Sequence, residues 1–353
     1  MKKKKLLALL LPVQIIIVKL LSLFPELTER WYSNGLYPYI AAASRSIFGW
    51  AGFSAGDIIY GIALIFALRW LWQKRKTWKY NYKNNLVTVL ACFSIVYFLF
   101  NFLWALNYNR VPLYKKMAIE KDYTTNELEA FTKRLITKTN ATHALIEKNN
   151  ILKITVPYSV SEIYTRSVNG YGALEKQFPF FTYSRKSIKS SLFSVPLSYM
   201  GFGGYLNPFT SEAQVNNELP KYNLPTTTCH EMAHQIGYAN ESEANFIGYM
   251  ASINSNDVYF KYSGYSFALK YCLRNLHKID KAREKKLLPL IDKGVLKNFK
   301  ESEDFSKKYE SFVEDIFKYI YDNFLKINNQ KDGLETYSKF VGLMVNYYKD
   351  KDL

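Results

Sequence analysis

Residues 226–246 read TTTCHEMAHQIGYANESEANF, and this stretch decides what the rest of the chain must build. On a helix, residues i and i+4 share one face, so His230 and His234 can present two imidazole nitrogens to one cation. Glu231 then projects beside them toward a metal-bound water. The chain has only four histidines, so two at this spacing around a glutamate favour a metal site over ordinary helical histidines. We predict Zn²⁺ held by His230 and His234, with Glu231 as the catalytic base.

A catalytic zinc needs a third protein ligand, and two carboxylates follow the histidines. Gly237 predicts the end of the first helix and Asn240 the N-cap of a second. Glu243 lies three residues after this cap, where a capping-box glutamate folds back on the cap residue. Glu241 is left free to face the histidines. We therefore predict Glu241 as the third ligand, with Glu243 as the alternative.

Two further residues of this stretch have predicted roles. Asn245 lies one turn after Glu241 on the same face, where its amide is expected to orient a ligand histidine. Cys229 adjoins His230, but successive helical residues point about 100° apart, so we predict that Cys229 packs in the core. The three cysteines are widely spaced and indicate no disulfide framework.

Three apolar stretches precede this region, at residues 6–24, 56–72 and 85–106. Each reaches the roughly 17 to 25 residues that cross a hydrocarbon layer of about 30 Å. The first stretch runs on without a small-residue cleavage site, which favours an uncleaved anchor over a signal peptide. We predict three transmembrane helices over residues 1–107, with residues 29–50 of the loop between the first two along the outer interface.

The distribution of charge predicts the orientation of these helices. Four lysines precede the first span and five Lys or Arg lie in residues 73–83, whereas the loop at residues 25–55 has only Arg30 and Arg45. The positive-inside rule places the N-terminus and the connector in the cytoplasm, and residues 108–353 outside it. The net charge is +17, but more than half of it lies in the first 107 residues. We therefore expect the lipid bilayer as a partner and no nucleic acid.

From residue 108 onward, amphipathic helices alternate with turn-rich stretches, without a linker or repeat. We predict one mostly helical α+β domain with a small sheet over residues 108–353. Thr124 and Glu127 predict a capping box that opens a helix running to about Lys148. Apolar residues at spacings of three and four predict a later helix with a core-facing stripe. The stripe consists of Phe305, Tyr309, Phe312, Ile316, Ile320 and Phe324.

HEMAH followed by ESEAN resembles the gluzincin peptidases, in which a glutamate from a second helix completes the HExxH motif. The resemblance implies a zincin-like metallopeptidase domain and zinc ligation by Glu241, with Ala244 and Asn245 matching the second motif. Six residues separate His234 from Glu241, whereas gluzincins usually have a longer insertion. The three spans, GYLNPFTSEAQVN, CHEMAHQIGYANESEANFIGY, YFKYSGY and the C-terminal YDNFLKINNQKDGLETYSKFVGLM resemble a bacterial membrane family called domain of unknown function 3810.

These features predict a membrane-anchored zinc metallopeptidase that hydrolyses a peptide or protein substrate on the periplasmic side of a bacterial inner membrane. The alternative is a catalytically inactive, metallopeptidase-like binding or scaffold module. An intact Glu231 argues against the alternative, because a structural metal site needs no base. A membrane assembly or transport component is a third reading, which rests on the spans alone.

The substrate side of the site has weaker signals. Zincins pair extended substrate with an edge strand upstream of the motif helix, and residues 210–218 are in the right order for that strand, although an ordinary hairpin fits them equally. The motif is far from the apolar spans in the sequence, so we expect the site in water. Candidates for stabilising the oxyanion are Tyr262, Tyr265, Tyr337 and, more weakly, His277.

Overall fold

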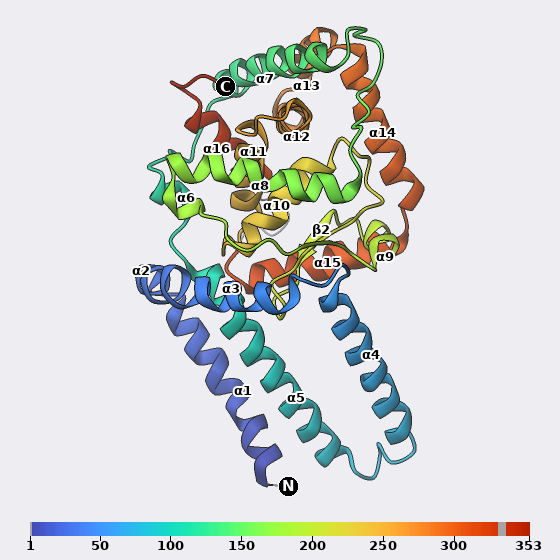
Figure 1. Ribbon diagram of the computed structural model, residues 1–353. Coiled ribbons are helices and arrows are strands. Elements are labelled where there is room, and N and C mark those ends of the chain that lie inside the picture. Colours follow the sequence, from blue (N-terminus) through green and yellow to red (C-terminus); the bar gives the residue numbers. More distant parts are fainter. Residues whose placement is uncertain (1, 331–336) are drawn as a thin grey trace.

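The computed structural model describes residues 2–330 and 337–353, and shows a group of long apolar helices joined to a larger, mainly helical body (Figure 1). The described part of the chain is mostly helical with one small sheet, as predicted. The N-terminal elements are α1 (Lys2–Leu21), α2 (Pro25–Leu27), η1 (Thr28–Leu36), α3 (Tyr37–Phe48), α4 (Ala55–Lys74), α5 (Tyr82–Leu103) and η2 (Ala105–Asn109).

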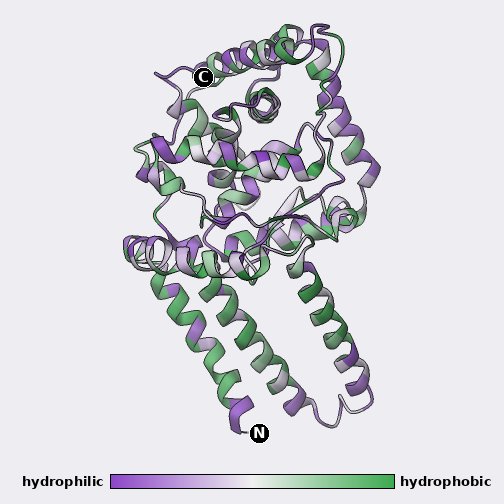
Figure 2. Cartoon of the chain, viewed as in Figure 1, coloured by the Kyte–Doolittle hydropathy of each residue, from purple (hydrophilic) through white to green (hydrophobic). Residues whose placement is uncertain are grey.

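Two of these helices, α4 and α5, are each long and apolar enough to cross a membrane. The helix α1 passes the same test only together with residues 25–48, and this pair is bent by 97°. The structure thus contains two candidate spans, or three if the bent pair is one, where the sequence predicted three. Apolar residues cover all three long helices, and polar residues mark their ends farthest from the body (Figure 2). Those polar ends are the N-terminus and the connector between α4 and α5 (Figure 1).

The segment predicted to follow the outer interface runs across the ends of the long helices as α2, the π-helical η1 and α3 (Figure 1). The helix α4 is capped by Ser54, whose hydroxyl accepts a hydrogen bond from Asp57 N. The buried Asp57 carboxylate accepts bonds from Ser191 Oγ at 2.9 Å, from Leu192 N at 2.7 Å and from the Tyr205 hydroxyl. The first turn of α4 is therefore fastened to the body.

The body is built of short and long helices around a central pair, α10 and α11. Its elements up to this pair are α6 (Leu113–Lys116), α7 (Thr125–Ile146), α8 (Val160–Gln177), η3 (Pro179–Phe181), β1 (Ile188–Ser190), α9 (Ser194–Tyr199), β2 (Gly204–Leu206) and β3 (Ala213–Val215). The pair and the elements after it are α10 (Leu224–Gln235), α11 (Glu241–Ile253), α12 (Val258–Ile279), α13 (Lys281–Leu287), η4 (Leu288–Leu290), α14 (Lys293–Tyr309), α15 (Phe312–Ile327) and α16 (Tyr337–Tyr347). The capping box of Thr124 and Glu127 opens α7 as predicted.

The sheet has the order β1-β3-β2, with β3 parallel to β1 and antiparallel to β2. The segment predicted as the edge strand, residues 210–218, contains β3 and therefore lies in the centre of the sheet. Of the two interpretations of this segment, the edge strand was wrong, because β1 supplies a partner on the far side of β3, whereas the antiparallel pair of β2 and β3 agrees with the hairpin. In the described sheet the edge strands are β1 and β2.

The stripe predicted as one core-facing helix is divided between α14 and α15. The helix breaks at Glu310 and Ser311, whose backbones are extended, and the break turns the following apolar face outward. Phe312 is 75% exposed, and Ile316 and Ile320 are 51% and 53% exposed. The helix α15 lies in the layer of the body nearest the spans (Figure 1), so this apolar face is exposed next to them.

The central pair meets closely, because a Cβ at Gly248 of α11 would lie 2.8 Å from the backbone nitrogen of His230 on α10. Cys229 is fully buried in this core, as predicted. The pair is joined by a turn in which Gly237 has a φ of +88°, the left-handed C-cap predicted from the sequence. Asn240 caps α11 by accepting bonds from Ser242 N and Glu243 N, also as predicted.

The C-terminal end of α10 is held by the membrane-proximal segments. The last carbonyls of a helix have no partner within the helix, and four side chains from outside donate to those of α10 and the turn after it. They are Trp104 to His234 (3.1 Å), Tyr37 and Arg45 to Gln235 (both 2.9 Å) and Arg110 to Gly237 (2.9 Å). Arg110 also forms a two-pronged pair with Glu29, at 2.9 and 2.8 Å.

Replacing Arg110 with methionine should destabilise the chain by about 3 kcal/mol, because Glu29 loses its main partner in a buried pair and the Gly237 carbonyl loses its donor. Thermal unfolding of the detergent-purified full chain measures this as a fall in Tm. The matched control is Lys133→Met, which removes an exposed pair with Glu129 and should change stability by less than about 1 kcal/mol. An Arg110→Met protein with the same Tm as the Lys133→Met control would contradict the prediction.

Candidate metal centre

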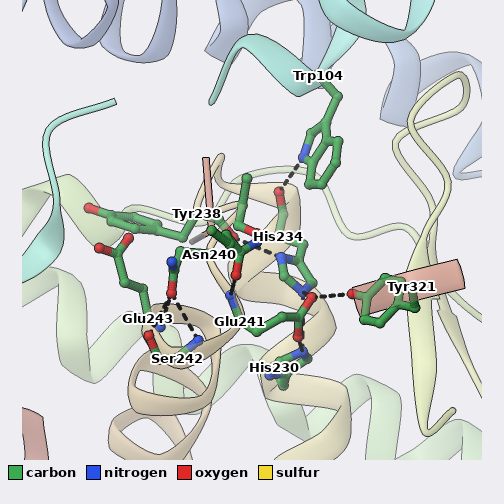
Figure 3. A network of polar contacts seen from close by, with 11 residues as sticks. Trp104, His230, His234, Tyr238, Asn240, Glu241, Ser242, Glu243 and Tyr321 are labelled. Carbon is green, nitrogen blue, oxygen red and sulfur yellow. Dashed lines mark hydrogen bonds and ion pairs between the residues drawn. The ribbon is translucent and has the colours of Figure 1, made fainter. Parts of the chain in front are cut away.

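The three predicted ligands converge at the junction of α10 and α11 (Figure 3). His230 and His234 lie one turn apart on α10, with their Nε2 atoms 3.1 Å from each other. Glu241 is the first residue of α11. Its Oε2 lies 3.3 Å from His230 Nε2 and its Oε1 3.6 Å from His234 Nε2. Two helices thus bring two nitrogens and a carboxylate to one point.

These separations fit a zinc ion. Zinc–nitrogen bonds of about 2.0–2.1 Å in a tetrahedral site place neighbouring ligand atoms roughly 3.3–3.4 Å apart. The two ring nitrogens are 3.1 Å apart, and Glu241 approaches His230 through Oε2 at 3.3 Å and His234 through Oε1 at 3.6 Å, so each separation lies within a few tenths of an ångström of that edge, although the two carboxylate distances involve different oxygens. Two imidazoles and one carboxylate, with a fourth position left for water, are also the ligand set of a catalytic rather than a structural zinc site.

The tautomer of His234 suits a ligand. Its Nδ1 lies 2.7 Å from the Tyr238 carbonyl oxygen, which can only accept, so Nδ1 carries the proton and Nε2 keeps its lone pair. A backbone carbonyl that holds a histidine in this way is a usual outer partner of a metal ligand. The left-handed turn at Gly237 brings that carbonyl back to the helix.

A second outer partner comes from α15. The Tyr321 hydroxyl donates a 2.6 Å hydrogen bond to Glu241 Oε1 (Figure 3). Sequence reasoning missed Tyr321, because it lies 80 residues from Glu241 and its helix was interpreted only as a core stripe. The same is true of Trp104, whose indole donates to the backbone of His234.

Glu231 belongs to the same cluster, and its carboxylate is close enough to His230 and His234 for the three to hold a metal ion. One of its carboxylate oxygens lies within 4.8 Å of ligand nitrogens of both His230 and His234, and Oε2 has no hydrogen-bond partner among the described residues. From the protein groups alone, burial raises the pKa of Glu231 to about 8, and Glu241 adds to the shift while His230 opposes it. This arrangement leaves Glu231 able to take up a proton.

Glu241 has the opposite electrostatic environment. Burial would raise its pKa, but His234, His230 and Tyr321 outweigh burial and lower the pKa to about 2. Burial lowers the pKa of His234 to about 4. Glu241 is therefore an anion and His234 a neutral imidazole at neutral pH, which are the forms that bind a cation. Two adjacent carboxylates whose pKa values are pushed apart suit two different roles.

The alternative ligand, Glu243, is directed away from the cluster. Its Oε1 accepts a 2.7 Å hydrogen bond from Leu113 N, and burial raises its pKa to about 7. The predicted capping box is not formed, because Asn240 caps α11 alone while Leu113, an amide from a distant segment, takes the Glu243 carboxylate.

Asn245 lines the same cavity as the ligands. Burial lowers the pKa of His230, but Glu241, Glu231 and Asn245 together raise it above its ordinary value. A side-chain hydrogen bond to Asn245 is one of the contributions to this rise, whereas Nδ1 of His230 has no hydrogen-bond partner among the described residues. The predicted role of Asn245 in orienting a ligand histidine stays a prediction.

The candidates for oxyanion stabilisation lie elsewhere. Tyr262 is buried and donates to Asn298 at 2.8 Å, and His277 pairs with Glu284 at 3.0 Å. Tyr265 contacts the ring of Tyr249. None of these three lines the cavity at the cluster, and the side chain of Tyr337 lies outside the described residues. The tyrosines that do line the cavity beside the ligands include Tyr108, Tyr271 and Tyr321.

A cavity of about 870 Å³ extends from the cluster toward the spans. The histidines and both glutamates lie in its wall, and so do Tyr60 of α4 and Val96 and Phe100 of α5. The expectation that the site lies in water stays a prediction. The motif is distant from the spans in the sequence, but the fold packs the end of α10 against the membrane-proximal segments.

The free edge strand β2 passes directly by the base. A Cβ at Gly204 would lie 2.6 Å from Glu231 Oε1 and 2.6 Å from the Gln214 carbonyl oxygen. A residue larger than glycine has no room there. The absence of a side chain at Gly204 is therefore what lets the backbone of β2 approach the Glu231 carboxylate so closely. The edge that sequence reasoning assigned to residues 210–218 is thus supplied by Gly204–Leu206.

The family described as "Protein of unknown function (DUF3810)" matches residues 32–345. This range covers both apolar spans, the cluster and most of the C-terminal helices, and the chain belongs to this family. No curated protein and no solved structure matches the chain.

Substituting the two competing carboxylates separately should identify the third ligand. Glu241→Gln should lower the zinc affinity of the full chain by at least about 10-fold, because it removes an anionic ligand, whereas Glu243→Gln should leave the affinity within about twofold. Equilibrium dialysis of the detergent-purified proteins against zinc buffers measures both. Equal losses in the two variants, or a loss in Glu243→Gln alone, would refute the assignment.

Tyr321→Phe should weaken zinc binding by roughly 10-fold, because an outer hydrogen bond that orients a ligand typically contributes 10- to 100-fold to affinity. Tyr319→Phe is the matched control, since Tyr319 lies on the same helix and is 73% exposed. The same dialysis applies, and indistinguishable affinities for the two variants would show that the Tyr321 bond does not support the ligand.

Proposed function

We propose that this member of the family is a membrane-anchored zinc peptidase, hydrolysing a peptide or amide bond at the outer face of a bacterial inner membrane. The observation that carries the proposal is the convergence of His230, His234 and Glu241 beside an unpartnered oxygen of Glu231. The likeness of the two motifs to those of gluzincins supports the same chemistry. The connection of the site to a large cavity gives a substrate access to it.

The residues of the cluster have different roles in the proposed hydrolysis. A zinc ion held by the three ligands would supply Lewis acidity and lower the pKa of a bound water. Glu231 accepts a proton from the attacking water and passes it to the leaving amine. A pKa raised by burial suits this exchange near neutral pH, because the group can both gain and lose the proton. Tyr321 keeps Glu241 in place meanwhile.

We propose that the substrate backbone binds along the edge of β2. An extended peptide can add to a free strand edge through main-chain hydrogen bonds. Because Gly204 of that strand nearly touches Glu231, a peptide paired with β2 has its scissile bond next to the base. This arrangement favours an extended peptide or amide over a compact small molecule.

The orientation follows from charge. The connector between α4 and α5 and the N-terminus are both basic and lie at the same end of the long helices, away from the body (Figure 1). The positive-inside rule makes that end cytoplasmic, which puts the site on the periplasmic side.

A non-catalytic binding or scaffold module is the competing function. A buried carboxylate oxygen without a hydrogen-bond partner lowers stability by several tenths to a few kcal/mol. A scaffold has no use for such a group at Glu231, whereas a peptidase requires it. The proposal therefore accounts for a feature that the alternative leaves without a reason.

Glu231→Gln should retain zinc at the native stoichiometry and abolish hydrolysis, since the amide cannot take up the proton. The measurement compares peptides released from membrane fractions of cells producing either the native chain or the variant, together with the zinc content of both purified proteins. Identical peptide profiles from the two membranes would move the assignment to the scaffold module.

A further inference from the structure

We infer that the substrate is acylated, with a hydrocarbon chain that lies between α4 and α5 while its amide or peptide bond reaches the zinc cluster. This inference rests on the proposed function and names its class of substrate. The hydrolysed bond is the C–N bond of the amide: the hydroxyl of water joins the carbonyl carbon, and the proton passes through Glu231 to the departing amine.

The first support is the continuity of the cavity. One wall is formed by α5, through Val96 and Phe100, and another by Tyr60 of α4. Tyr60 stacks on Tyr205 of the edge strand with ring centroids 6.3 Å apart. A ligand in the cavity therefore touches membrane helices at one end and the strand beside Glu231 at the other.

The second support is the division of the lining by polarity. The charged ligands and the base are gathered at the α10–α11 end, whereas the end near the spans is apolar and aromatic, with Val96, Phe100, Pro208, Phe209 and Phe324. A molecule that satisfies both ends has a polar, hydrolysable head and an apolar tail.

The third support concerns what can occupy the apolar end. An extended peptide there would leave backbone N–H and C=O groups without hydrogen-bond partners in an apolar environment, which is strongly unfavourable. A peptide folded as a helix is 10–12 Å across and would have to unwind to present its bond to the cluster. An acyl chain has no polar groups, so the apolar end favours an acyl chain over a membrane-spanning peptide.

The fourth support is the opening toward the bilayer. The helix α1 packs along α5, whereas α4 stands apart from both (Figure 1). On the side of the body, α15 exposes Phe312, Ile316 and Ile327 and reaches α5 by packing Phe324 against Phe100, with centroids 6.1 Å apart. Apolar side chains exposed at this level suit the boundary of a membrane, where acyl chains are at hand.

The test is photo-crosslinking of the full-length Glu231→Gln chain, loaded with zinc, in phosphatidylcholine nanodiscs. The probe is an N-palmitoyl tetrapeptide amide with a diazirine in the middle of its acyl chain, and adducts are mapped by mass spectrometry. We expect adducts on Tyr60, Phe100 or Phe209. Val96→Trp, which fills the cavity, should reduce them at least about fivefold.

Ile95→Trp is the matched control, because Ile95 adjoins Val96 on α5 and is 44% exposed but does not line the cavity. It should leave the adducts unchanged. The inference is overturned if both variants reduce labelling equally, if the peptide without its acyl chain competes as well as the acylated one, or if a diazirine phosphatidylcholine labels the same residues to the same extent.

The readout does not depend on hydrolysis. Failure of the proposed function appears separately, as identical peptide release by the native chain and the Glu231→Gln chain, while cavity adducts persist. Failure of the inference appears as hydrolysis that requires Glu231 but proceeds equally on the peptide with and without its acyl chain.

Discussion

The rest of the structure depends on one constraint: the buried carbonyl groups at the end of α10 need hydrogen-bond donors. A helix end buried without hydrogen-bond partners is costly, and α10 has few residues of its own after His234 to cap it. The donors instead come from Trp104, Tyr37, Arg45 and Arg110, all outside the body's own helices. The helix that carries two of the candidate metal ligands is therefore completed by the segments that flank the spans.

This dependence explains why the candidate site and the membrane helices share a cavity. Once the end of α10 is fixed against the membrane-proximal segments, His234 lies near the upper turn of α5, and Trp104 packs across its ring with centroids 6.1 Å apart. The same junction admits α15, so Phe324 can touch Phe100 while Tyr321 reaches Glu241. The cavity beside the cluster is therefore lined in part by residues of α4 and α5.

The sequence predicted the features that depend on neighbouring residues. The histidine spacing, the left-handed turn at Gly237, the Asn240 cap and the choice of Glu241 as the residue facing the histidines all follow from helical geometry over a few positions. Contacts between distant segments were not predictable in this way. The edge strand was misplaced because β1 pairs with β3, and Glu243 bonds Leu113, 130 residues away. The outward face of α15 depends on two extended residues that periodicity cannot detect.

The electrostatics of the cluster argue that it is functional rather than a by-product of packing. Burial alone would raise the pKa of every carboxylate in the site. The pKa of Glu241 is instead lowered to about 2 by two imidazoles and a tyrosine, whereas the pKa of Glu231 is raised to about 8 because burial outweighs the opposing effect of His230. A structural ion pair would have matched both carboxylates with donors. Metal-assisted hydrolysis requires two different carboxylates. One, here Glu241, is held as an anion, and the other, here Glu231, is free to exchange a proton.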